Sequence, residues 1–242
     1  MRTIGTTALL AMLLAAGNVL GQEPPAEKRK IQEEGRQAET TAAREADPRP
    51  EPEKERTAEE KAEVLEKEAA AKDGKASPAP EEKITRAEAQ AVDPEGKKPL
   101  DDALTCLART IYWEAKGEGR DGMAAVANVV MNRLASDAFP KTVCAVVKQG
   151  VETKTCQFSW WCDGRPDDVE EEKRYDLAKE IARAALNNEL SDRTGGALYF
   201  HHERVHPEWS EKYTRTVQIE EHLFYKPKGE ANGKHGPNAE AR

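Results

Sequence analysis

Glu114 is the residue whose position in the sequence best suits acid catalysis. It lies seven residues after Leu107 and three after Ile111, a spacing that places side chains on one buried face of a helix. A glycine-rich stretch begins at Gly117, so the carboxyl group is expected near the helix end and partly removed from water. Burial raises the pKa of a carboxyl group, which can then donate a proton near neutrality. The alternative is a side chain that turns into solvent from the last helical turn.

Glu118 follows one turn later and has two interpretations. Its carboxylate could face the same cleft, or it could cap a backbone group or pair with Lys or Arg. Acid catalysis that also activates water or forms a covalent adduct requires a second carboxylate. The candidates for that role are Glu118, Asp163, Glu203 and Glu208, and the sequence leaves their roles open.

The loop between Cys156 and Cys162 carries the sequence QFSWW. A disulfide between these cysteines would hold a tight loop in which polar and aromatic groups are exposed together. Amides and hydroxyls bond to sugar substituents and aromatic faces stack on sugar rings, so the loop is a candidate wall for a glycan. Phe158 and one tryptophan could instead belong to the core, and of Trp160 and Trp161 we expect one inside and one outside.

Three histidines form a second cluster of possible metal ligands. His202 and His206 are four residues apart, as in helical zinc sites. Residues 198–202 are typical of a strand, where side chains four apart do not converge, and Pro207 blocks a helix. No metal site is therefore expected at His201, His202 and His206.

These residues lie in motifs whose types and order resemble one known family. The segments are residues 106–118 (CLARTIYWEAKGE), 122–133 (GMAAVANVVMNR), 139–149 (FPKTVCAVVKQ), 156–164 (CQFSWWCDG), 195–202 (GGALYFHH), 207–209 (PEW) and 218–225 (QIEEHLFY). Together they resemble the cell-wall hydrolase family of spore-cortex-lytic (SleB-type) enzymes. The resemblance covers essentially all of residues 100–226 and nothing before them.

The resemblance implies a lysozyme-like catalytic domain that cleaves peptidoglycan glycan strands between N-acetylmuramic acid and N-acetylglucosamine. It implies lytic transglycosylase chemistry: Glu114 protonates the glycosidic oxygen, and the muramic C6 hydroxyl closes a 1,6-anhydro ring. One Glu then serves as acid and base, and no cofactor is expected. The doublet His201-His202 departs from the single strand histidine of the family. The expected substrate-binding residues are Tyr112, Glu118, Gln157, Phe158, Ser159, Trp160 and His201.

Two functions of other kinds remain as alternatives. The first is a non-catalytic envelope module that binds peptidoglycan, and the second is a zinc-dependent envelope hydrolase. The products of peptidoglycan digestion would distinguish these two functions from a lytic transglycosylase.

Periodicity predicts four helices followed by a small sheet. Apolar residues recur three and four positions apart in the helical segments and two apart in the strands. The segments are 104–115 with Asp101 or Asp102 as cap, 123–134 with Asp121 as cap, a third helix with Pro140 in its first turn, a fourth over 166–190, and strands within 197–202 and 214–225. The predicted fold class is α+β, helix-dominant, with a small hairpin or sheet.

Composition divides the chain of 242 residues into folded and unfolded parts. The 13 aromatic residues all lie between Tyr112 and Tyr225, and residues 22–99 hold few large aliphatic side chains. Because such a segment cannot offset its ordering entropy, we predict a disordered charged linker over 22–99, a catalytic domain over 100–226 and a disordered tail over 227–242. Within the linker, residues 57–72 could form a transient charged helix.

Residues 1–21 are typical of a signal peptide, because a basic residue precedes an apolar run that ends in small residues. This predicts an exported protein of the periplasm or cell envelope. In that compartment cysteines form disulfides, and we favour Cys106 with Cys144 and Cys156 with Cys162 among the three possible pairings. A zinc site of four thiolates is the rival, disfavoured because the spacings contain no C-x2-C pair.

The net charge of −8, without a cluster of basic residues, argues against a nucleic-acid partner. An uninterrupted run of 18 apolar residues is absent, which argues against a transmembrane span. The expected partner is the peptidoglycan glycan strand, and an envelope protein could bind the linker.

Overall fold

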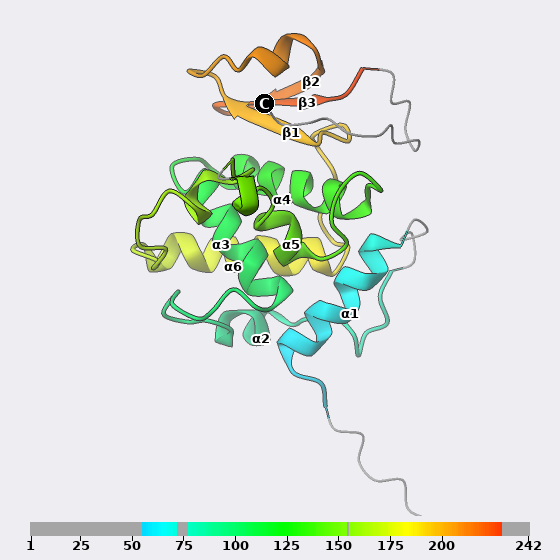
Figure 1. Ribbon diagram of the computed structural model, residues 1–242. Coiled ribbons are helices and arrows are strands. Elements are labelled where there is room, and N and C mark those ends of the chain that lie inside the picture. Colours follow the sequence, from blue (N-terminus) through cyan, green and yellow to red (C-terminus); the bar gives the residue numbers. More distant parts are fainter. Residues whose placement is uncertain (1–54, 72–76, 154, 229–242) are drawn as a thin grey trace, which may run out of the picture. The chain divides into compact units, whose positions relative to one another are not determined.

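A helical body and a small antiparallel sheet make up residues 55–71, 77–153 and 155–228, the ranges that the computed structural model describes (Figure 1). The helices are α1 (Ala58–Ala70), α2 (Arg86–Ala91), α3 (Ala103–Ala115), α4 (Arg120–Ala135), α5 (Val143–Val147) and α6 (Glu172–Leu186). The strands are β1 (Tyr199–His202), β2 (Thr214–Ile219) and β3 (His222–Lys226), and three short 3-10 helices are η1 (Val151–Thr153), η2 (Ser159–Trp161) and η3 (Glu208–Glu211). This confirms the predicted α+β, helix-dominant class.

Several predictions concern residues outside the described ranges. The signal peptide, residues 1–21, and residues 229–242 of the predicted tail are among them. Within the described ranges, no helix is both long enough and apolar enough to span a bilayer.

Helix α3 is the centre of the helical body and contacts α1, α4, α5 and α6. Eleven of its 13 residues are buried, as expected for a helix that is apolar on nearly every side. Asp102 is its N-cap, as predicted, and accepts a hydrogen bond from the Thr105 backbone N–H at 2.8 Å. The predicted disulfide between Cys106 and Cys144 is present and links α3 to α5, with 5.3 Å between the two Cα atoms. This packing fixes the direction in which the last turn of α3 points.

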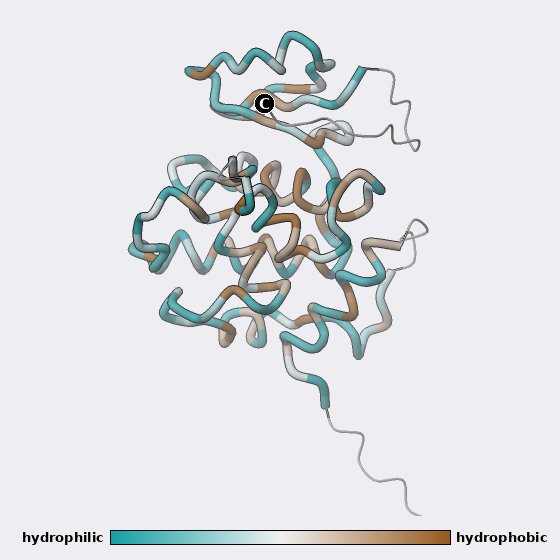
Figure 2. Tube along the Cα trace, in the orientation of Figure 1, coloured by the Kyte–Doolittle hydropathy of each residue, from teal (hydrophilic) through white to brown (hydrophobic). Residues whose placement is uncertain are grey.

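The prediction of a disordered linker over 22–99 is wrong for the described part of that range. Helices α1 and α2 pack against the body, and Leu65, Ile84 and Val92 are buried in its core. Both helices begin with a capping box, in which Thr57 or Thr85 exchanges hydrogen bonds with the Glu three residues later. Figure 2 shows α1 as mostly hydrophilic. A narrow stripe of alanines and one leucine docks it together with polar contacts, since the Val143 N–H donates to Glu66 at 2.7 Å and Lys61 pairs with Glu88 at 2.7 Å.

The sheet has the strand order β1-β3-β2, with both pairs antiparallel. It packs on α4 through an apolar cluster of its own, in which Phe224 of the central strand contacts Ala125 and Val129 of α4 and Ala197 before β1. The predicted sheet is thus confirmed, and it covers one side of the helical body (Figure 1).

The N-terminus of α4 differs from its prediction. Gly119 is at the cap position, and the predicted cap, Asp121, lies in the first turn and pairs with Arg193 instead. The free backbone N–H groups of Gly119 and Gly122 donate to the carboxylate of Glu220, at 2.6 and 3.3 Å. A residue of the β2–β3 turn therefore caps this helix, an arrangement that local sequence does not reveal.

Helices α5 and α6 are shorter than predicted. Thr142 caps α5 and Pro140 lies outside it. Residues 166–171 precede α6 because side chains of α3 bind their backbone: Tyr112 accepts from the N–H groups of Glu170 and Glu171, and Trp113 donates to the carbonyl of Asp167. These bonds replace the helical ones that the predicted range required.

Candidate active site

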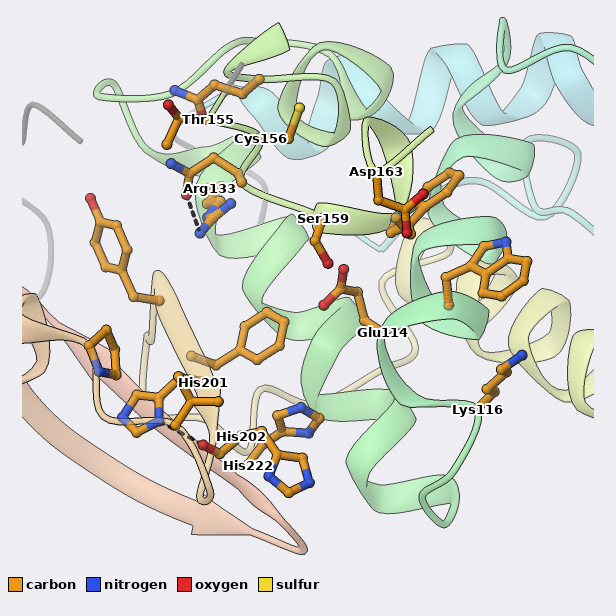
Figure 3. Close-up of a pocket in the computed structure, with 18 of the residues that line it drawn as sticks. Glu114, Lys116, Arg133, Thr155, Cys156, Ser159, Asp163, His201, His202 and His222 are labelled. Atoms are coloured by element: carbon orange, nitrogen blue, oxygen red, sulfur yellow. Dashed lines mark hydrogen bonds between the residues drawn. The ribbon is translucent and has the colours of Figure 1, made fainter. Parts of the chain in front are cut away.

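A groove of about 1530 Å³ lies between the helical body and the sheet. Its floor is the end of α3 with Arg133 of α4, one wall is the loop of residues 155–170, and the other wall is β1, η3 and His222 of β3 (Figure 3). Its volume exceeds the usual range for a small-molecule pocket, which suits an extended ligand.

Glu114 lies in this groove at the last turn of α3. Its carboxylate points toward the hydroxyl of Ser159 from η2 (Figure 3), and no described residue donates a hydrogen bond to it. Burial raises the pKa of Glu114 to about 7, although the positive charges of His222 and Arg133 act to lower it. A group with this pKa can hold its proton near neutrality and also lose it, which suits a general acid and base.

Glu118 lies outside the groove lining, and its predicted substrate contact stays a prediction. Its side chain is 8% exposed, and Oε1 lies 2.6 Å from Nδ1 of His222. Gly122 makes this position possible, because a Cβ there would lie 1.8 Å from Oε2 of Glu118. Glu118 therefore positions His222, which itself lines the groove beside Glu114.

Arg133 is a groove residue that the sequence analysis did not single out. It is 3% exposed, and its Nε donates to the Leu198 carbonyl at 2.7 Å while Nη2 donates to Oε1 of Gln157 at 3.2 Å. Burial lowers the pKa of Arg133 to about 10, so it stays charged at neutral pH. The available signal was its spacing, since it follows Val130 by three residues on the buried stripe of α4.

The loop with the sequence QFSWW forms one wall of the groove. The predicted disulfide between Cys156 and Cys162 closes it, with 6.4 Å between the two Cα atoms. Gln157, Ser159 and Trp160 line the groove, and their contact with substrate stays a prediction.

The other two aromatic residues of the loop differ from Trp160. Phe158 is completely buried, which contradicts its expected substrate contact, and it supports the loop from below. Trp160 is 6% exposed and Trp161 is partly exposed, which agrees with one tryptophan inside and one more open to solvent.

Tyr112 is also a core residue rather than a groove residue. Its side chain is completely buried, and its hydroxyl accepts the two backbone bonds that hold residues 170 and 171. Its expected substrate contact is therefore wrong. The adjacent Trp113 does line the groove.

His201 lines the groove from β1, as expected. Its ring stacks on Tyr225, and its Nε2 lies 3.1 Å from the Tyr225 hydroxyl. His202 also lines the groove and bonds to Glu221, whereas His206 is not part of the lining. Across the described ranges, no three His, Cys, Asp or Glu side chains are grouped to hold a metal ion. All four cysteines are in disulfides, which contradicts the rival zinc site of four thiolates.

Among the candidates for a second carboxylate, Asp163 lines the groove, while Glu118, Glu203 and Glu208 do not. Glu114 is thus the groove acid whose pKa is raised to about 7, and Asp137, Asp163, Asp167, Asp168 and Glu170 also line the groove.

Comparisons with known proteins agree on one family. Residues 117–225 match the Cell Wall Hydrolase family, a range that begins three residues after Glu114. The chain is 32% identical over 135 residues to a spore cortex-lytic enzyme of Oceanobacillus iheyensis. The matched stretch covers 55% of this chain and 44% of that protein. It is 29% identical over 124 residues to the spore cortex-lytic enzyme of Bacillus subtilis, covering 50% of this chain and 36% of that one.

Among solved structures, the catalytic domain of the germination-specific lytic transglycosylase SleB from Bacillus anthracis matches with 29% identity and a TM-score of 0.42. The match covers 51% of this chain and 93% of that one. The chain spans less than half the length of the curated relatives described above. Residues 117–225 are therefore similar to the cell wall hydrolase family.

Proposed function

We propose that this protein cleaves the glycan strand of peptidoglycan between N-acetylmuramic acid and N-acetylglucosamine, as a lytic transglycosylase with Glu114 as its acid and base. The observation that carries the proposal is a carboxyl group with a pKa of about 7 in a groove large enough for a polymer. The match of residues 117–225 to the Cell Wall Hydrolase family supports peptidoglycan as the substrate.

In this mechanism the protonated Glu114 donates its proton to the glycosidic oxygen, and the bond from that oxygen to muramic C1 breaks. The muramic C6 hydroxyl attacks C1 and closes the 1,6-anhydro ring. The carboxylate of Glu114 accepts the proton that this hydroxyl loses, which restores the starting state. His222 and Arg133 face the carboxylate and stabilise its charge after proton donation.

A single carboxylate is sufficient for this route, because the nucleophile is the hydroxyl of the substrate itself. Hydrolysis would instead require Asp163 to activate water.

The substrate lies outside the cytoplasm, so the proposal includes export by the predicted signal peptide, residues 1–21, to the periplasm or envelope. Residues 1–54 precede the described fold, and we propose that part of this segment is the tether through which an envelope protein binds.

The test is digestion of purified peptidoglycan by the full chain, with mass analysis of the products. Wild type should release 1,6-anhydro muropeptides. Glu114→Gln should lose activity by at least about 100-fold with an unchanged circular dichroism spectrum, because the amide has no proton to donate. Glu208→Gln removes an exposed acid outside the groove lining and is the matched control.

Other outcomes would identify the alternatives. Wild-type turnover in Glu114→Gln would rule out the assigned acid. Reducing-end products without the anhydro ring, lost in Asp163→Asn, would indicate hydrolysis with two carboxylates. Intact strands that still bind the protein would indicate a binding module, and loss of activity with EDTA would indicate a metal-dependent hydrolase.

A further inference from the structure

The two disulfides of the fold lie in different surroundings. Cys106 is completely buried, and its partner Cys144 packs against the same core. In the other bridge, Cys156 is half-buried and lines the groove, and Cys162 is exposed to solvent. A thiol reduces a disulfide by reaching one of its sulfur atoms. A reductant in solution therefore reaches the bridge at the groove more readily than the bridge in the core.

The two bridges also differ in how much they restrict the unfolded chain. Cys106 and Cys144 are 38 residues apart in the sequence and join α3 to α5, whereas Cys156 and Cys162 are 6 residues apart. The entropy lost on closing a loop grows with its length, so the short bridge contributes less to global stability. Its main effect is therefore on the local geometry of the residues that it encloses.

These enclosed residues form a wall of the groove that holds Glu114. Ser159 points toward the Glu114 carboxylate (Figure 3), and Trp160 lines the same groove. Gln157 accepts a hydrogen bond from Nη2 of Arg133 at 3.2 Å, which joins the loop to α4. The conformation of the loop therefore determines which groups surround the acid.

The second half of the loop has few bonds to the rest of the molecule. The N–H groups of Trp161 and Cys162 donate to carbonyl groups inside the loop itself. In the described part of the chain, the next hydrogen bond to the helical body is at the Asp167 carbonyl. Phe158 and Trp160 are buried in the core. Apart from this packing of aromatic rings, the bridge is what fixes residues 159–166.

We infer that the disulfide between Cys156 and Cys162 is a redox control of the groove. The oxidised loop supports cleavage of the glycan strand, and the reduced loop slows it. This inference rests on the proposed function and adds a regulator to the same site. The regulator is a dithiol that reaches Cys162, while the bridge between Cys106 and Cys144 stays closed and keeps the helical body folded.

The exchange proceeds in two balanced steps. A thiolate of the dithiol attacks Sγ of Cys162 and forms a mixed disulfide, and Cys156 leaves as a thiolate. The second thiolate of the reductant then attacks the reductant sulfur of the mixed disulfide, and Cys162 leaves. Two electrons pass to the protein, the dithiol becomes a disulfide, and the two protons that it loses go to the two cysteine thiolates. An oxidised dithiol reverses both steps.

The test is a titration of the oxidised full chain with dithiothreitol, followed by alkylation and mass analysis of the cysteine peptides. The bridge of Cys156 and Cys162 should open at a lower reductant concentration than that of Cys106 and Cys144. Cleavage of peptidoglycan should fall by about 10- to 100-fold as it opens, because displacement of the groove wall misplaces the reacting groups. The circular dichroism spectrum should not change, and oxidised glutathione should restore activity.

Two outcomes of this titration would overturn the inference. The first is that both bridges open at the same reductant concentration. The second is full activity when only the bridge of Cys156 and Cys162 is open.

Two paired variants separate the effects of the bridges. Cys156→Ser with Cys162→Ser reproduces the open loop, so it should cleave as slowly as the reduced wild type and should not respond to dithiothreitol. Cys106→Ser with Cys144→Ser is the matched control. Its melting temperature should fall further, because the loop that it opens is longer, and its activity should still respond to dithiothreitol. Wild-type turnover of the Cys156→Ser, Cys162→Ser variant would contradict the inference, whether or not the control variant folds.

Hydrogen exchange and strand binding separate this inference from the proposed function, because neither requires cleavage. Amide exchange in the peptide that carries residues 156–164 should become faster when the bridge opens. Co-sedimentation of Glu114→Gln with intact strands should show weaker binding in the reduced state. A wild type that never cleaves strands in either redox state would refute the proposed function alone. Exchange and affinity that do not change on reduction would refute the redox control alone.

Discussion

Asp93 and Glu114 are two acids of the folded unit whose surroundings shift their pKa values in opposite directions. Asp93 is 5% exposed, and its carboxylate accepts hydrogen bonds from the backbone N–H groups of Lys97 and Lys98, from Nε of Arg109 and from the Tyr175 hydroxyl, at 2.7 to 3.0 Å. Burial acts to raise the pKa of Asp93, but these bonds and the charge of Arg109 outweigh it, so the pKa lies below its usual value.

Glu114 has an arginine near it as well, yet its pKa is raised to about 7. The two pKa values differ because hydrogen-bond donors reach the carboxylate of Asp93 but not that of Glu114. Arg133 directs two of its nitrogens to Leu198 and Gln157 rather than to Glu114, whereas Arg109 bonds directly to Asp93. Burial without donors therefore keeps Glu114 near the point of protonation.

The comparison distinguishes a structural acid from a reactive one. Both lie beside α3, because Arg109 and Glu114 belong to the same helix. The cluster around Asp93 satisfies every oxygen and stabilises the fold, while the groove leaves polar atoms of Arg133 and Trp160 without partners. Buried polar groups without hydrogen-bond partners destabilise a protein. Where such groups persist, a functional role is expected, as at an active site.

Asp93→Asn should produce the largest loss of stability. The amide leaves the buried charge of Arg109 uncompensated, and breaking a buried ion pair on one side costs about 3–5 kcal/mol. Urea unfolding at pH 7 measures the change. Glu95→Gln is the matched control: Glu95 is 80% exposed and 4.0 Å from Lys97, and an exposed pair contributes about 0.5 kcal/mol.

The same cluster has a predictable pH dependence. Because the pKa of Asp93 is lowered in the folded state, its contribution is present above about pH 4 and is lost as pH falls through the lower folded value. Asp93→Asn should remove that part of the acid denaturation. Equal stability of Asp93→Asn and Glu95→Gln at pH 7 would show that the cluster does not stabilise the fold.

Glu114→Gln should change stability in the opposite direction. The folded pKa of about 7 lies above the unfolded value of 4.5, so the contribution of Glu114 to stability is fully present below pH 4.5 and is lost as pH rises through 7. The shift corresponds to about 3 kcal/mol. At pH 8 the variant should therefore be more stable than wild type by up to this amount, and at pH 4 equal to it.

Thermal unfolding at pH 4, 6 and 8 measures this difference. Glu208→Gln, an exposed acid, supplies the control. A Glu114→Gln variant that is less stable than wild type at pH 8 would mean that the ionised carboxylate is well solvated or bonded, and the contrast with Asp93 would disappear.

Strong periodicity explains why much of the fold was predictable. Helix α3 repeats apolar residues at three and four positions over 13 residues, and its cap at Asp102 has a clear local signal. Helix α1 was misjudged because it buries only a stripe of Ala58, Ala62 and Leu65 among charged residues. Mean composition does not resolve so narrow a stripe, although the capping boxes at Thr57 and Thr85 were visible in the sequence.

The candidate site was predictable where one residue in its helix position determines the chemistry, as for Glu114. It was not predictable where two distant segments meet. Glu118 follows α3 and pairs with His222 of β3, and Arg133 of α4 donates a hydrogen bond to Gln157 of the disulfide loop. Aromatic residues were ambiguous for another reason. A phenylalanine such as Phe158 can either stack on a sugar or fill the core, and the path of the backbone determines which of these two positions its side chain takes.

Glu220 lies between the two acids of the comparison and should have the smallest effect. Like Asp93 it accepts backbone N–H bonds, from Gly119 and Gly122, but like a surface residue it is exposed. Glu220→Gln keeps one acceptor and removes the charge at the N-terminus of α4, so we expect a loss of about 1 kcal/mol in urea unfolding.

The neighbouring Glu221→Gln is the matched control, since its carboxylate pairs with exposed His202 and Arg204 and not with a helix end. Glu220→Gln should lose part of its effect at high salt, because an exposed charge at a helix end is screened. A loss as large as that of Asp93→Asn would show that exposure does not separate these acids. The number of bound donors alone would then set how much a carboxylate stabilises this fold.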